Sequence, residues 1–348
     1  MAVPSVNFTV DSTTVESVKP SGDVVFVVGP PGTGGTGAVG TLYYGDKLAD
    51  FTGVVGTAGD VRDFIDALFS QVGVDLVYSP TAAAPTNTQI GAAIDLANDA
   101  SKKPTILHVV GDLTAVSDAT TVNAVATKLA LVAGSLGCRA VANTPQDSAA
   151  SAVAWGNNNG DGRLIGVFNQ NKTGASSYKF PSGFWIGAAL NVAANRGRAW
   201  GINFASVKGL AELRHDLAPY SSVLSSLDAA GVSAMVNDQG VERIIGDEFK
   251  ADSATDPQRF WTIGRVVDHV QRTLEAQARL LIGSTRSADR MAIKLTMALN
   301  PIVHAGELVS GTVAADSART QGATKYFKAD LGLKYATNIV NVEFGFTV

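Results

Sequence analysis

Short apolar runs alternate with stretches of helical spacing between about residues 51 and 170. The apolar runs predict strands at Val74–Ser79, Thr105–Val110, Arg139–Ala142 and Leu164–Phe168. The stretches between and after them predict helices at about 59–70, 87–99, 118–136 and 146–155, and a further buried-strand candidate, Val24–Val28, precedes them all. Strands that alternate with helices are typical of a parallel sheet with right-handed crossovers. We therefore expect an α/β fold with a mostly parallel sheet and flanking helices.

The pattern changes in the second half, which predicts an α+β arrangement. It contains a helix of small residues at Gly183–Asn195, a strand around Trp200–Phe204 and a helix at Tyr220–Ala230. Two further strands, Val232–Val236 and Val241–Ile245, flank the sequence Asn-Asp-Gln-Gly, which is a hairpin signal.

Two helices should follow this hairpin. The first begins at Asp256, a good N-cap residue, with Pro257 at the first helical position. Its apolar residues recur every three or four positions and form one stripe: Phe260, Ile263, Val267, Val270, Leu274, Ala278 and Leu281. The second helix should run from about Ser287 to Asn300, where Pro301 is expected to end it.

Both ends of the chain alternate like strands. The N-terminal alternation is at Val3, Val6, Phe8 and Val10, and the C-terminal one is at Ile339, Val340, Val342, Phe344 and Phe346. These ends either fray or pair with the sheet edge of another chain. The expected division is an extended arm at 1–20, an α/β domain at 21–170 and a C-terminal domain at 171–348.

Composition and charge exclude several classes of function. The chain has 348 residues, of which 46% are hydrophobic, so it can bury a core. With a net charge of −4 the chain lacks the positive electrostatic potential that attracts a phosphate backbone, so we expect no nucleic-acid partner. No apolar run reaches about 18 residues, so no membrane insertion is expected. One cysteine, Cys138, and four histidines argue against a disulfide or a zinc site.

The glycine-rich run from Gly29 to Gly40 raises the question of a nucleotide site. A phosphate-binding loop of the P-loop type needs a lysine where Gly35 stands, and no helical pattern follows the run. We interpret it as a flexible loop. An α/β enzyme that binds a nucleotide at residues 29–40 remains the alternative, and a non-contractile surface or adhesion protein is a third possibility.

Other candidate chemistry is weak. Asn157, Asn159 and Asp161 copy the first positions of a calcium loop, but Phe168 stands where a glutamate ligand is needed, which favours a polar turn. No histidine has a nucleophile elbow near it. We predict no catalytic, metal or cofactor site.

A basic stripe is the remaining feature. Arg286, Arg290 and Lys294 recur every four residues and share one face of the helix that ends before Pro301. Spacing alone leaves two interpretations, a solvated face or a docking surface for an acidic partner.

Four stretches of the second half resemble the tail sheath protein of contractile phage tails and related injection systems. Pro181-Ser182-Gly183, followed by a small-residue helix, Arg196-Gly197 and Trp200, is similar to the family's P-P-S-G segment with one proline missing. The other three stretches are Leu227–Val232, Val241–Phe249 and Phe260–Val270. In that order, they resemble the family's turn into a strand, its hairpin return and its helix that begins with tryptophan.

This resemblance implies a structural protein and not an enzyme. It implies a subunit that polymerises as stacked rings, six-fold in the family, around a tail tube and contracts by rigid-body rearrangement, without a cofactor. The implied partners are further copies of the chain, a tube protein, and baseplate and tail terminator proteins. The implied location is a virion tail assembled in the bacterial host cytoplasm. It also implies that both terminal strands pair with neighbouring subunits and that Arg286, Arg290 and Lys294 face the tube.

Overall fold

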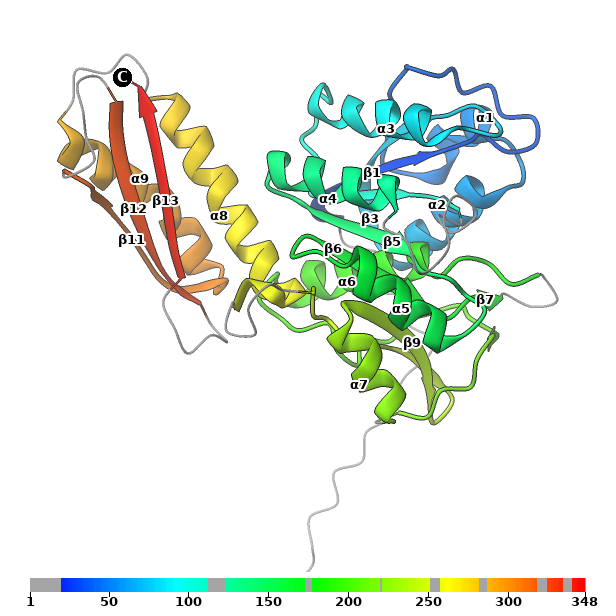
Figure 1. Cartoon of the computed structure of the whole chain (residues 1–348). Helices are drawn as coiled ribbons and strands as arrows, with labels where there is room; N and C mark the ends of the chain where they lie inside the picture. Colours follow the sequence, from blue (N-terminus) through cyan, green and yellow to red (C-terminus); the bar gives the residue numbers. More distant parts are fainter. Residues whose placement is uncertain are drawn as a thin grey trace, which may run out of the picture.

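The computed structural model describes residues 20–111, 123–172, 177–219, 221–250, 257–281, 287–317, 324–333 and 340–347. These residues form two lobes (Figure 1). The larger lobe is a sheet between layers of helices, and the smaller one, on the left of the figure, pairs two helices with a three-stranded sheet. The long helix α8, Trp261–Arg279, leads from the first lobe into the second.

The larger lobe is built on an eight-stranded sheet in the order β10-β9-β6-β5-β4-β1-β3-β2. The strands are β1 Pro20–Gly29, β2 Tyr43–Gly45, β3 Gly73–Pro80, β4 Ile106–Val109, β5 Arg139–Asn143, β6 Leu164–Phe168, β9 Val232–Asp238 and β10 Val241–Ile245. The edge strands β2 and β10 are antiparallel to their neighbours, and the strands between them run parallel. A two-stranded ribbon, β7 Asn171–Lys172 with β8 Glu212–Leu213, lies outside this sheet.

Helices cover both faces of the sheet, as the parallel strands require. The helices of this lobe are α1 Thr52–Val55, α2 Asp60–Gln71, α3 Asn87–Asp95, α4 Ala124–Leu136, α5 Ala149–Asn159, α6 Ser182–Arg196 and α7 Ser222–Ala229. Alternate residues of β1 divide between the faces: Val25 and Val27 join the core under α2 and α6, and Phe26 joins the core under α3 and α4. Helices α5 and α7 cover β9.

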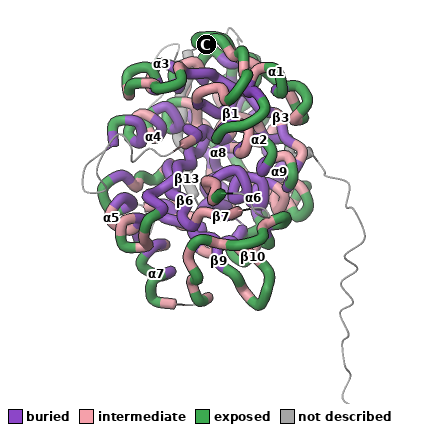
Figure 2. The backbone as a smooth tube through the Cα atoms, turned by 90° about the vertical axis from the view of Figure 1, so that its right-hand side faces the viewer, coloured by how far each residue is buried: buried purple, intermediate pink, exposed green. Residues whose placement is uncertain are grey.

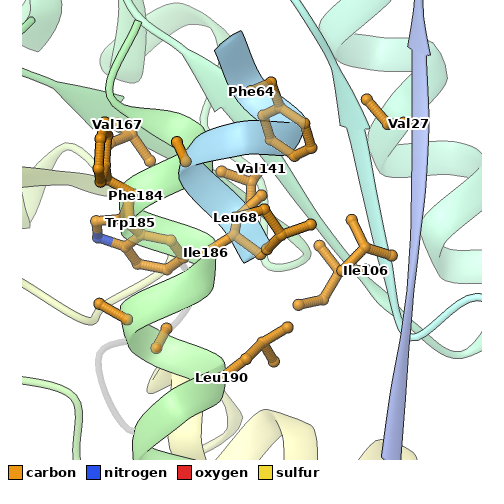
Figure 3. Close-up of a cluster of buried hydrophobic side chains, with 14 of the residues drawn as sticks. Val27, Phe64, Leu68, Ile106, Val141, Val167, Phe184, Trp185, Ile186 and Leu190 are labelled. Atoms are coloured by element: carbon orange, nitrogen blue, oxygen red, sulfur yellow. The ribbon is translucent and has the colours of Figure 1, made fainter. Parts of the chain in front are cut away.

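Two glycines let α6 lie close to α2. A Cβ at Gly183 would lie 2.6 Å from the Phe64 carbonyl oxygen, and a Cβ at Gly187 would lie 2.7 Å from the Gln71 side chain. The small residues that the sequence places in α6 therefore serve this close packing. Figure 3 shows the result, a buried cluster to which α2 contributes Phe64 and Leu68 and α6 contributes Trp185 and Ile186.

The smaller lobe has its own core. Helices α8 and α9, Ala288–His304, pack against β11 Leu308–Ala315 and β12 Thr324–Leu333, and β13 Val340–Thr347 completes the sheet in the order β11-β12-β13. The buried stripe of α8 includes Val267, Val270 and Leu274. Figure 2 shows buried segments gathered in the centre of the molecule, with exposed ones at its periphery.

Most predicted elements are confirmed, including the four strands between residues 74 and 168 and the hairpin of β9 and β10. Side-chain caps fix several helix starts, since Asn123 accepts from the backbone N–H of Val125 and Ser148 from that of Ser151. Asp256 lies outside the described residues, and α8 begins at Trp261 after a 3₁₀ turn at Pro257–Arg259.

Three expectations were wrong. Residues 200–204 form no strand but end in a turn, where Phe204 has φ +63°, outside the extended conformation of a regular strand. Helix α9 continues through Pro301 to His304, where Met297 and Pro301 are exposed and water can replace the missing N–H donor. The large sheet continues past the boundary expected at residue 170, because β9 pairs with β6 at Gly166↔Val232 and so supplies the partner that β6 needs.

Candidate assembly surfaces and the junction between the lobes

Buried ion pairs join α8 to the amino ends of the parallel strands. Asp268 of α8 accepts from Arg139 of β5 at 2.7 Å and from Arg163, just before β6, also at 2.7 Å. The Arg139 and Asp268 side chains are each 2% exposed. Arg139 also donates to the Gly162 carbonyl, so this buried guanidinium has several partners. Burial lowers the pKa of Arg139, and Asp268 opposes that shift.

A second charged group lies on the same helix. Arg265 of α8 pairs with Asp23 of β1 at 2.7 Å, and both side chains are buried. Arg198, which follows α6, lies 3.9 Å from Asp23 and pairs with Glu307 at 3.2 Å, while Glu307 also meets His269 at 2.9 Å. Burial alone would raise the pKa of Asp23, but Arg265 and Arg198 outweigh it and hold this pKa below its usual value. The pairs therefore connect both lobes through buried and partly buried charges, which are screened much less than charges on the surface.

Close packing supports these pairs. Gly264 faces the Arg139 guanidinium, and a Cβ there would lie 2.3 Å from its Nη2 atom. Trp261 of α8 lies edge-on to Trp185 of α6 and parallel to Phe249, with ring centres 4.8 and 5.8 Å apart. This aromatic cluster and the ion pairs hold α8 against the larger lobe.

The outer face of α9 carries the predicted basic stripe. Arg290 and Lys294 are exposed, whereas Arg286 lies outside the described residues. The opposite face, with Met291, Leu295 and Leu299, is buried in the core of the smaller lobe.

Sequence reasoning missed the apolar part of this outer face. Ile293 is 60% exposed and Met297 is 54% exposed, and both lie on the turns that carry Arg290 and Lys294. The spacing of three and four residues was the signal that could have found them. The face therefore combines positive charge with exposed apolar surface, which is typical of an interaction surface.

The two chain ends have different outcomes. Val3, Val6, Phe8, Val10 and Ile339 lie outside the described residues. Val340, Val342, Phe344 and Phe346 belong to β13, which pairs antiparallel with β12 of the same chain. In the described sheet, β11 and β13 are the edge strands. Pairing of the ends with neighbouring subunits stays a prediction.

The glycine-rich run, residues 29–40, is hydrogen-bonded to residues 54–58. The N–H groups of Gly32, Thr33 and Gly37 donate to the carbonyls of Val55, Ala58 and Val54 at 2.8 to 3.0 Å. A Cβ at Gly32 would lie 1.7 Å from the Ala58 carbonyl oxygen, so this approach requires glycine. The amides that could hold a phosphate are thus bonded to the backbone, and the loop is more fixed than we expected.

The histidines and the polar turn have structural roles. His108 is fully buried, contacts the Val141 carbonyl and the Ser182 hydroxyl at 2.8 and 2.9 Å, and has its pKa lowered to about 4 by burial. Asp161 accepts from the Arg163 amide in the turn before β6. In the described ranges no three His, Cys, Asp or Glu side chains are grouped to hold a metal ion. No helix among these residues is long and apolar enough to span a membrane.

Solved structures match this architecture over its whole length. A chain of the baseplate of the anti-feeding prophage superposes with a TM-score of 0.73 at 15% identity, covering 100% of both chains. A chain of the contracted helical sheath of the same prophage gives 0.69 at 13% identity, covering 99% of both. A sheath tail protein from Listeria innocua gives 0.67 at 10% identity, covering 95% of this chain and 96% of that one.

The chain has the fold of contractile-tail sheath proteins. No protein-family model and no curated protein matches the sequence. The sheath fold covers both lobes, so the resemblance found in residues 180–348 extends in three dimensions to the α/β lobe, where the sequence offered no motif.

Proposed function

We propose that this chain is a structural subunit of a contractile tail sheath. It polymerises as stacked rings around a tail tube and contracts to drive the tube through a target envelope. The observation that carries the proposal is the full-length correspondence with sheath chains, including chains from contracted sheaths. The identities of 10 to 15% mean that the fold, and not the sequence, supplies the support.

The partners follow from this role. The main partner is the chain itself, in rings of six, and the others are a tube protein, a baseplate and a tail terminator. The correspondence with a chain of a six-fold symmetrised baseplate supports the ring symmetry and the baseplate contact. The subunit works in the tail of a virion or injection particle, assembled in the cytoplasm of the bacterial host.

Contraction requires no hydrolytic site in this proposal. A polymer with two packings can store free energy at assembly and release it when the subunits rearrange. The ion pairs of Asp23 and Asp268 favour movement of the two lobes as one body, because separating the lobes would break both pairs and the packing around them.

Three surfaces carry the contacts. Arg286, together with the α9 face that carries Arg290 and Lys294, meets acidic groups of the tube, and Ile293 and Met297 of that face add apolar contact. The arm at about 1–20 and the final strand at about 338–348 pair with neighbouring subunits. Such pairing uses the backbone hydrogen bonds of exposed sheet edges, which β11 and β13 offer among the described strands.

Sedimentation of the purified chain with and without nucleotide separates this role from the enzyme alternative. A sheath subunit should form large species as its concentration rises and should bind neither ATP nor NAD. Saturable nucleotide binding that disappears on replacing Gly35 and Gly37 would favour the enzyme. A third result, monomers at every concentration without nucleotide binding, would contradict both.

A further inference from the structure

A hollow with a cavity volume of about 420 Å³ lies where α8 begins. Its lining comes from the segment after α6, the chain that follows β10 and the start of α8. The lining residues are Trp200, Gly201, Asp247, Phe260, Thr262 and Ile263. This volume falls in the range of small-molecule sites, about 300–1,000 Å³.

The walls of the hollow are mostly apolar. Trp200 and Phe260 supply aromatic rings and Ile263 supplies an aliphatic side chain. The Thr262 hydroxyl already donates to the Trp200 carbonyl at 3.2 Å. Asp247 is therefore the charged residue among the described residues of the lining. An apolar pocket with a single well-placed polar group is typical of a ligand site.

Asp247 is buried and held in place. Its side chain is part of a residue that is 8% exposed, and its Oδ1 accepts from the Asn203 amide at 2.9 Å. The Asn203 side chain in turn accepts from the Gly246 N–H at 2.7 Å. The backbone carbonyl of Asp247 accepts from the Trp261 N–H at 2.7 Å. A carboxyl group fixed in this way loses little conformational freedom when a ligand binds.

The neighbours of Asp247 do not balance its charge. Asp228 of α7 and Glu248 are both acidic, and the nearby Arg259 pairs with Glu248 at 3.5 Å. Within the described ranges no ion pair joins Asp247 to a cation. Burial, together with these two acids, raises the pKa of Asp247 to about 6. At neutral pH the hollow thus contains a buried carboxylate that lacks a counter-charge, which a bound cation can supply.

The walls favour an organic cation over a metal ion. A calcium ion takes about six or more oxygen ligands, whereas the described lining offers one carboxylate among carbon surfaces. Aromatic rings attract organic cations, and two guanidiniums already use these rings outside the lining. Arg196 lies 5.7 Å from the centre of the Trp200 ring, and Arg259 lies 4.8 Å from that of Phe260.

We propose that this hollow binds a small organic ammonium ion. The charged group pairs with the Asp247 carboxylate, and the apolar body of the ion lies against Trp200, Phe260 and Ile263. The site is independent of the proposed function, because no contact with a tube or a second subunit enters the argument. An occupant would also brace the start of α8, which leads from the larger lobe into the smaller one.

Calorimetric titration of the full-length chain with benzylammonium tests this site. Benzyl alcohol is the uncharged control of similar size. At pH 7.5 benzylammonium should bind one per chain and about tenfold more tightly than the alcohol, because a charge-assisted hydrogen bond is stronger than a neutral one. Asp247→Asn can still accept from Asn203 and should abolish this preference. Asp46→Asn, which removes an exposed charge, should not.

The pH dependence of binding gives a second measurement. Benzylammonium stays charged between pH 5 and 7.5, so a change in affinity reports on the protein. A carboxyl with a pKa of about 6 is mostly ionised at pH 7.5 and about one-tenth ionised at pH 5. Affinity should therefore fall about tenfold at pH 5 in the unmodified chain and stay constant in Asp247→Asn.

The outcomes separate this site from the sheath role. Absence of benzylammonium binding, equal affinity for the two probes, or an unchanged preference in a folded Asp247→Asn variant overturns the site. Circular dichroism checks that the variant is folded, and sedimentation scores assembly separately. Assembly without probe binding overturns the site alone. Binding of the probe by a chain that never assembles supports the site and contradicts the sheath role.

Discussion

Asp268 is the residue on which the junction depends most. It is the counter-charge of buried Arg139 and also binds Arg163, so Asp268→Asn removes the negative charge with little change in volume. We expect a loss of about 3–5 kcal/mol in the free energy of unfolding, because a buried guanidinium is left without its counter-ion. Denaturant unfolding measures the loss.

The control for this change is Asp75→Asn, which breaks the exposed pair with Lys102. It should cost at most about 1 kcal/mol, since surface ion pairs contribute little. Equal effects of the two variants would mean that the junction does not depend on the buried charge.

Asp247 should make stability depend on pH. Burial, with Asp228 and Glu248 nearby, raises the pKa of Asp247 to about 6 from the ordinary 3.8. The folded state therefore binds this proton more tightly, and stability contributed by the neutral carboxyl is lost as pH rises through about 6. Asp247→Asn, which can still accept from Asn203, should raise the melting temperature at pH 7.5 but not near pH 4. A difference that stays constant from pH 4 to 8 would exclude this effect.

The contact between helices α2 and α6 rests on glycine. Gly187→Ala places a Cβ 2.7 Å from Gln71 and should destabilise the protein by about 1–3 kcal/mol, as overpacking does. Gly134→Ala in α4 meets nothing within 4 Å and should stabilise by about 0.5–1 kcal/mol. Thermal unfolding of the two variants measures whether each substitution raises or lowers the stability of the protein. A stabilising Gly187→Ala would show that the helices have room to spare.

The outer face of α9 gives a prediction about tube binding. Replacing Arg286, Arg290 and Lys294 with Glu should leave empty sheath able to assemble but abolish ordered assembly on tubes. Each exposed contact is worth only about 0.2–1 kcal/mol, yet many repeats along a polymer add up. Electron micrographs of co-assembly reactions score the result. Salt screens exposed charges least at low ionic strength. Normal co-assembly of this variant with tubes at low salt would therefore show that the stripe is only a solvated face.

The sequence predicted elements better than it predicted their contacts. The β9–β10 hairpin and the strands of the large sheet followed from periodicity and turn residues that lie close together in the chain. The turn at 200–204 was missed because tertiary hydrogen bonds from β10 impose a positive φ on Phe204. The pair of Arg139 with Asp268 joins residues far apart in the sequence, so no local pattern could reveal it.

In the proposed contraction the two lobes of each subunit move as one body. The proposed links between such bodies are the chain ends, so deleting residues 1–15 should yield folded subunits that fail to polymerise. Circular dichroism checks folding and sedimentation checks assembly. Normal polymers of the truncated protein would rule out the arm as an essential link.

Electron microscopy of the purified protein tests the sheath role. A sheath subunit should form hollow cylinders or stacked rings, and this fold should fit extended and contracted forms without rearrangement of the two lobes. A monodisperse monomer at high concentration would contradict the claim.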